Sequence, residues 1–140
     1  MKMEITREDV WVATMKDQPG SLAGKLATLS EAGANLEFII ARRSPDKPGT
    51  GVVFITPLKG APQLKAAKSA GFKKSKSLHS LRLLTADKPG LGTLITQALA
   101  ENGINLRGFS GAAIGKKTVF HLAFDTTAAA TKAVRVLKKM

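Results

Sequence analysis

The chain has 140 residues, of which 44% are hydrophobic and 23% charged, a balance typical of folded domains rather than of a disordered chain. It contains no cysteine, which excludes disulfides, thiolate nucleophiles and cysteine-based zinc sites. The formal net charge of +12 attracts anionic partners but says nothing about the fold. No stretch resembles a signal peptide or a membrane span, so we expect a cytoplasmic protein without membrane contact.

The first half of the chain predicts the order strand, helix, strand, strand, helix, strand. A β-prone segment at 8–16 leads into the turn Asp-x-Pro-Gly, where Pro19 presets the backbone of a first helical position. Leucines spaced three or four residues apart then predict a helix that ends at Gly33. The remaining segments are predicted as strands at 35–43 and 52–56, a helix at 59–70 and a lysine-rich edge strand at 72–78.

The second half repeats this order. Residues 17–36 return at 87–106 without a gap, and eight of the twenty aligned positions are identical. The predicted elements are a strand at 78–86, a helix at 91–102, strands at 105–114 and 119–124, and a helix at 127–138. No residues follow for a last strand, so the first strand of this copy would have an open edge. Residues 2–6 or another chain would cover it.

Each copy is therefore predicted to be a ferredoxin-like βαββαβ unit of the α+β class, an antiparallel sheet with two helices on one face. We assign residues 1–77 to the first unit and 78–140 to the second, which lacks its last strand. Apolar residues fall on both sides of the first strand, with Val12 on one side and Trp11 on the other. Packing against the sister copy or another chain would cover the second face, which predicts a homodimer or larger homo-oligomer.

The repeated segment resembles the ACT domain, a small regulatory module that binds amino acids on many biosynthetic enzymes. The likeness lies in the Asp-x-Pro-Gly turn before the first helix and the Gly-x-Asn-Leu run after it, in both copies. It implies an amino-acid ligand at the seam between paired units, near the first loop of one and the second strand of its neighbour. No catalytic domain is attached, so the regulatory output would go to a separate enzyme or regulator. By position, the implied ligand-binding residues are Asp17, Gly20, Ser21, Asn35, Asp87, Gly90, Leu91 and Asn105.

These residue types suit an amino acid. An aspartate can pair with an ammonium group, an asparagine amide can donate to a carboxylate, and N–H groups at a helix start favour an anion. Structural roles are open to the same residues. The aspartates could cap the first helix, the asparagines could adopt a left-handed or Asx-turn conformation, and Gly20 and Gly90 could serve the backbone alone.

We expect neither an enzyme nor a cofactor or metal site. His79 and His121 are far apart in sequence and are interpreted as strand residues, and no nucleophile or phosphate-loop motif occurs. The alternative function is a basic interaction protein that binds an acidic partner or nucleic acid without a small ligand. Nucleic acid is the less favoured partner, because the predicted third strands lack the aromatic pattern with which RNA-recognition motifs stack bases.

Overall fold

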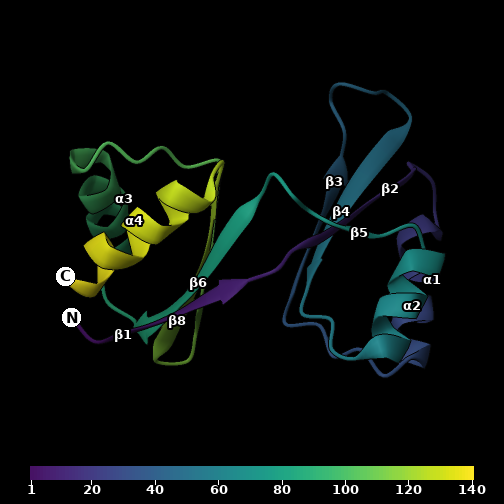
Figure 1. The fold of residues 1–140 in the computed structure, drawn as a ribbon, viewed down its shortest axis with the longest axis horizontal. Coiled ribbons are helices and arrows are strands. Elements are labelled where there is room, and N and C mark those ends of the chain that lie inside the picture. The colour runs from purple at the N-terminus through teal and green to yellow at the C-terminus, as the bar shows by residue number, and fades with distance from the viewer. The chain divides into compact units, whose positions relative to one another are not determined.

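Two four-stranded antiparallel sheets, each with two helices, make up residues 1–140 in the computed structural model (Figure 1). They belong to two separate units. The first unit is Asp9–Ser75, and the second unit is Lys76–Met140 together with Met1–Glu8. The tandem ferredoxin-like α+β fold predicted from the repeat is confirmed.

The first unit follows the predicted order with small shifts at its ends. Its elements are β2 (Trp11–Lys16), α1 (Ser21–Glu31), β3 (Phe38–Arg43), β4 (Thr50–Thr56), α2 (Ala61–Ser69) and β5 (Lys73–Lys74), and its sheet order is β3-β4-β2-β5. The last strand predicted at 72–78 is reduced to two exposed lysines at the sheet edge. Two charged residues add little apolar burial, so the pairing is short.

The second unit has the same plan with longer strands. Its elements are β1 (Met3–Glu8), β6 (His79–Ala86), α3 (Leu91–Glu101), β7 (Gly108–Ile114), β8 (Lys117–Phe124) and α4 (Thr127–Lys138), in the sheet order β1-β6-β8-β7. Apolar periodicity explains the helix packing, since the buried residues of α3 are Leu91, Ile95 and Leu99, four apart on one stripe. On β8, Phe120, Leu122 and Phe124 alternate with residues on the other face of the sheet and face the same core.

The N-terminal strand β1 supplies the strand that the second copy lacks. It pairs antiparallel with β6 from Met3↔Thr85 to Glu8↔Ser80, at the edge that β5 occupies in the first unit. Glu8 Oε1 also lies 2.9 Å from His121 Nδ1 on β8, with side chains only 8% and 9% exposed. The prediction that N-terminal residues cover the open edge is confirmed. The division at residues 77 and 78 follows the repeat, whereas packing places the first eight residues with the second copy.

Each unit has its own apolar core between sheet and helices. The second-unit core is the larger, with twelve buried residues that include Leu99 and Phe120. In the first unit the buried set is Ala13, Leu29, Val53, Ile55, Ala67 and Phe72. None of the helices is long and apolar enough to cross a membrane.

Candidate functional site

The loop that opens the first helix has the same backbone in both units. Gly20 and Gly90 stand immediately before α1 and α3 with φ of 89° and 82°, a left-handed conformation that glycine adopts without strain. The aspartate N–H of each loop donates to the hairpin turn of the same sheet, from Asp17 to the Gly49 carbonyl at 3.0 Å and from Asp87 to the Lys116 carbonyl at 2.9 Å. The loop is therefore held against the neighbouring hairpin in each copy.

The helix capping considered as an alternative role for the aspartates does not occur. Neither α1 nor α3 has a side-chain cap, because the capping position is taken by glycine, three residues beyond each aspartate. Pro19 also lies before the helix, which begins at Ser21, and not at its first position. The carboxylates are consequently directed to other partners.

Those partners differ between the units. In the first unit, Arg43 Nε on β3 donates to Asp17 Oδ2 at 2.8 Å, forming an ion pair. In the second unit, the Thr118 hydroxyl on β8 donates to Asp87 Oδ1 at 2.7 Å, and no ion pair involves Asp87. The carboxylate of Asp87 thus has a hydroxyl group, and no cationic side chain, as its partner.

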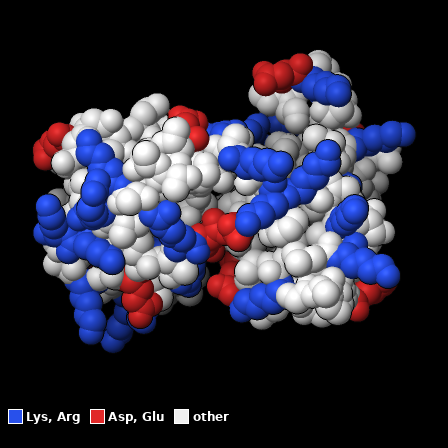
Figure 2. All heavy atoms as spheres, viewed as in Figure 1, with Lys and Arg blue, Asp and Glu red and all other residues white.

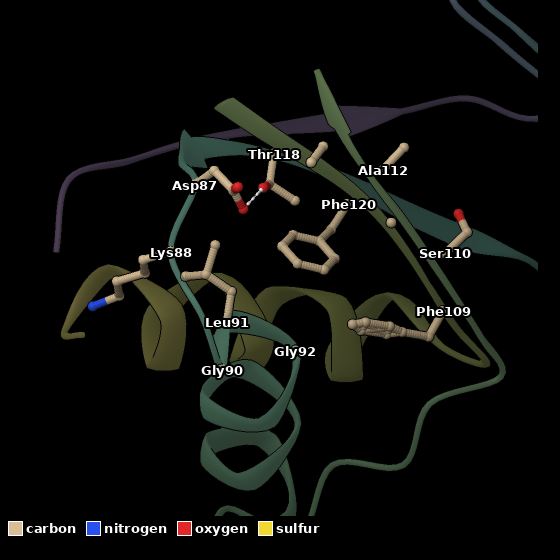
Figure 3. Close-up of a pocket in the computed structure, with 12 residues that line it drawn as sticks. Asp87, Lys88, Gly90, Leu91, Gly92, Phe109, Ser110, Ala112, Thr118 and Phe120 are labelled. Carbon is tan, nitrogen blue, oxygen red and sulfur yellow. Dashed lines mark hydrogen bonds between the residues drawn. The ribbon is translucent and has the colours of Figure 1, made fainter. Parts of the chain in front are cut away.

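A shallow pocket of about 490 Å³ lies beside Asp87, and we call it the Asp87 pocket. Figure 3 shows Asp87 and Thr118 at its upper side, Leu91 below, Phe120 at the centre and Phe109 across from the loop. The lining residues come from the loop, the start of α3, and strands β7 and β8: Asp87, Lys88, Gly90, Leu91, Gly92, Phe109, Ser110, Gly111, Ala112, Ala113, Thr118 and Phe120. All of them belong to the second unit.

Two aromatic rings form the apolar wall of the pocket. Phe109 and Phe120 meet edge to face, with ring centroids 5.3 Å apart. Phe120 fits because its cross-strand partner is Gly111, where an added Cβ would lie 2.6 Å from the ring. Phe120 is buried, whereas Phe109 is 37% exposed and presents apolar surface at the pocket.

The pocket combines features that suit a small zwitterion. The unpaired charge of Asp87 can hold an ammonium group, and the first N–H groups of α3 have no partner within the helix and favour a carboxylate. Beside them, Leu91, Phe109 and Phe120 offer an apolar surface to a side chain.

Of the predicted site residues, Asp87, Gly90 and Leu91 come together in this pocket. Asn105 does not line it; this residue is exposed in the segment before β7. Asn35 is likewise exposed before β3, so neither asparagine opens its strand. The left-handed conformation considered for these asparagines does not occur, because only glycines have positive φ.

In the first unit, the corresponding predicted residues are Asp17, Gly20 and Ser21. Asp17 is engaged by Arg43, and the Ser21 N–H donates to the Gln18 carbonyl at 3.3 Å. Sequence reasoning missed Arg43, Thr118, Phe109 and Phe120. The available signal was Gly111, since a glycine inside a strand marks a close approach of another group.

The geometry defines a protein of two ferredoxin-like units with a loop-and-helix pocket. Residues 12–70 match the ACT domain family, and this match confirms the resemblance drawn from the repeated motif. No match was found among curated proteins.

Solved structures resemble the whole chain in fold. Protein BT0572 from Bacteroides thetaiotaomicron is 13% identical with a TM-score of 0.80, covering 96% of this chain and 89% of that one. The ligand-free regulatory subunit of aspartate kinase from Thermus thermophilus is 15% identical with a TM-score of 0.67, covering 99% and 96%. The Thermus flavus regulatory subunit is 15% identical with a TM-score of 0.63, covering 99% and 94%. These likenesses extend over both units.

Proposed function

We propose that this chain is a non-catalytic regulatory protein that binds a small amino acid in the Asp87 pocket. The ACT domain at residues 12–70 and the fold shared with aspartate kinase regulatory subunits support the regulatory role. The observation that carries the ligand site is the carboxylate of Asp87, which has a hydroxyl but no cation for a partner beside the start of α3. The resemblance to the ACT domain implies a ligand at a seam between units. We propose the Asp87 pocket instead, which residues of the second unit line alone.

A thermal-shift screen of the twenty L-amino acids at millimolar concentration tests the proposal. L-Leucine is the first probe, because the pocket wall is formed by Leu91, Phe109 and Phe120. A ligand at a hundredfold excess over its Kd stabilises the folded state by about 2.7 kcal/mol, which is readily measured. Asp87→Asn should remove the shift, while Asp46→Asn, which neutralises an exposed aspartate of the β3–β4 loop, should keep it. A screen in which no amino acid raises the Tm contradicts the proposal.

The regulatory output requires another molecule, and we propose a separate enzyme or regulator as its recipient. We also propose a homodimer, supported by the apolar sheet face of the first unit opposite its helices. Val12, Phe54 and Ile40 share that face across three paired strands, and Ile40 is 40% exposed. Light scattering at micromolar concentration tests this point, and a strict monomer contradicts it. A cytoplasmic location remains a prediction.

The net charge of +12 favours a second candidate, a basic interaction protein. On the face shown in Figure 2, lysine and arginine side chains are spread over both units with acidic side chains among them. Dispersed charge of this kind favours weak, salt-sensitive contact with polyanions over a dedicated groove. Retention on heparin across a salt series discriminates the two functions. Tight retention with a steep salt dependence, and no amino-acid response, supports the second candidate.

A further inference from the structure

The hairpins beside the two aspartate loops carry different residues at equivalent positions. In the first unit Arg43 on β3 pairs across the hairpin with Gly51, and in the second unit Ala113 pairs with Thr118. These pairs correspond, because the same hairpin alignment makes the Gly49 and Lys116 carbonyls accept from the two aspartate N–H groups. The arginine of one copy is therefore an alanine in the other, and the glycine is a threonine.

In the first unit, Arg43 already provides the positively charged group that the ammonium of the proposed ligand would provide. A guanidinium is always charged in proteins and forms directed hydrogen bonds to carboxylates. Its Nε donates to Asp17 at 2.8 Å, where the ammonium of an amino acid would otherwise bind. Because Arg43 is part of the same chain, its local concentration at Asp17 is high at any ligand concentration. Its positive charge also repels an incoming ammonium group.

The second unit has no arginine at the position equivalent to Arg43. Ala113 is too short to reach the carboxylate, and Thr118 contributes a neutral hydroxyl that orients Asp87 without cancelling its charge. Lys88 also lines the pocket, but the ammonium end of its side chain points away from Asp87 (Figure 3). The negative charge is thus available to a cation from solution.

We infer that the protein binds one amino acid per chain, through Asp87 alone, and that Arg43 acts as a tethered substitute that closes the equivalent site of the first unit. The inference rests on the proposed function and adds the stoichiometry and the residue that sets it. The two sites differ in the partner of the aspartate, which is the neutral hydroxyl of Thr118 in the second unit and the cationic guanidinium of Arg43 in the first. This difference determines which site binds the ligand. Competition by an exposed ion pair together with charge repulsion makes the first-unit site weaker by roughly tenfold or more.

Backbone amide NMR of the intact chain, titrated with L-leucine, tests the inference. Signals of residues 90–92 and 109–113 should move, with a stoichiometry of one, while those of residues 20–23 stay in place. N-acetyl-L-leucine, which lacks the ammonium charge, should leave all of these signals unmoved. If leucine gives no thermal shift, the amino acid with the largest shift in the screen takes its place.

Two sets of variants test the roles of the residues that differ between the two sites. Ala113→Arg combined with Thr118→Gly transfers the first-unit pair to the second unit and should weaken binding at Asp87 by roughly tenfold or more. Ile114→Arg is the matched control, because it adds the same charge on the same strand at an exposed residue outside the pocket lining. Arg43→Ala should let the signals of residues 20–23 respond to leucine. Arg42→Ala removes the neighbouring arginine, which lies on the other side of β3, and should not.

The outcomes separate this inference from the proposed function. Equal movement in both units of the wild-type chain overturns the inference and leaves amino-acid binding intact. Failure of Arg43→Ala to open the first unit shows that Arg43 is not the closing group and also overturns it. If no amino acid moves any signal, the proposed function falls and the inference falls with it.

Discussion

The two units of this chain share a backbone plan and differ in how they complete it. The first unit closes its sheet edge with the two-residue β5, whereas the second takes the six-residue β1 from the other end of the sequence. At the helix-opening loop, the first unit neutralises its aspartate with Arg43, whereas the second satisfies it with Thr118. Duplication preserved the Asp-x-Pro-Gly loop and left its surroundings free to change.

The core shows the same divergence at one cross-strand position. Ala41 faces Val53 in the first unit, and Gly111 faces Phe120 in the second. The larger side chain of Phe120 is matched by the smallest residue on its partner strand, because a Cβ at Gly111 would lie 2.6 Å from the ring. In the second unit this exchange places an aromatic wall beside the aspartate. The comparison teaches that a few neighbouring residues can change the surroundings of an unchanged loop.

The largest expected effect comes from deleting residues 1–8. This removes the β1–β6 ladder, the apolar contacts of Met3 and Ile5 with the second core, and the buried contact of Glu8 with His121. We expect the second unit to lose at least about 4 kcal/mol, which approaches the whole stability of a unit of this size. Trp11, the only tryptophan, lies in β2 of the first unit, so its fluorescence follows that unit alone. In urea, part of the circular dichroism signal, from the second unit, should be lost at a lower concentration than the fluorescence signal of the first unit. If both signals change together at the wild-type midpoint, the prediction is contradicted.

Next in size are alanine substitutions at the matched core leucines of the two first helices. Leu29 and Leu99 are 0% and 1% exposed, and each truncation should cost about 2–5 kcal/mol. Leu29→Ala should move the Trp11 fluorescence transition, and Leu99→Ala should move only the second transition followed by circular dichroism. Since the first unit buries fewer side chains, it has less stability to lose and should unfold at the lower urea concentration. A shift of both transitions by either variant would show that the units do not unfold independently.

A smaller effect is expected at the glycine beneath Phe120. Gly111→Ala places a Cβ 2.6 Å from the aromatic ring and should cost about 1–3 kcal/mol through overpacking. Displacement of the ring should also weaken leucine binding. Adding Phe120→Val recreates the Ala41–Val53 pair of the first unit and should relieve the overpacking, although not the loss of the aromatic wall. Urea unfolding checks the first effect and the leucine titration the second, and a stable Gly111→Ala chain with normal binding would contradict both.

The smallest stability effects belong to the partners of the two aspartates. Thr118→Val removes a partly buried hydrogen bond and should cost about 1 kcal/mol. Arg43→Ala breaks an ion pair whose arginine is 85% exposed, and should change stability by less than about 1 kcal/mol. The Arg43 effect should shrink further in 1 M salt, measured by urea unfolding, while the Thr118 effect persists. A large, salt-independent loss at Arg43 would mean that the pair holds the fold.

Much of the fold could be predicted because its signals are local. The helix predicted at 127–138 coincides with α4, and both hairpins lie close to their predicted positions, since apolar periodicity and glycine turns set them. Strand starts were less accurate. The strands predicted to start at residues 35 and 105 begin at Phe38 and Gly108, because an irregular segment with a bend separates each helix from the paired strand.

The site was only partly predictable, and the missing part is non-local. Asp87, Gly90 and Leu91 are neighbours in sequence and were found from the loop motif. Thr118 and Phe120 reach the pocket through the register of β8 with β6 and β7, which follows from hairpin length and is not visible in any short window. The capping role left open for the aspartates does not occur, because a glycine occupies the N-cap position of each helix.

The pairing of β1 with β6 joins segments more than half the chain apart in sequence, since Met3 lies opposite Thr85. Any other copy of the protein carries an identical first strand that fits the same edge with the same register. At high concentration, two chains that open this pairing can therefore exchange their leading strands and close again as an interlocked pair without losing a single backbone hydrogen bond. Slow, concentration-dependent interconversion between such species would be a property of the strand arrangement itself, present whether or not any small molecule is bound.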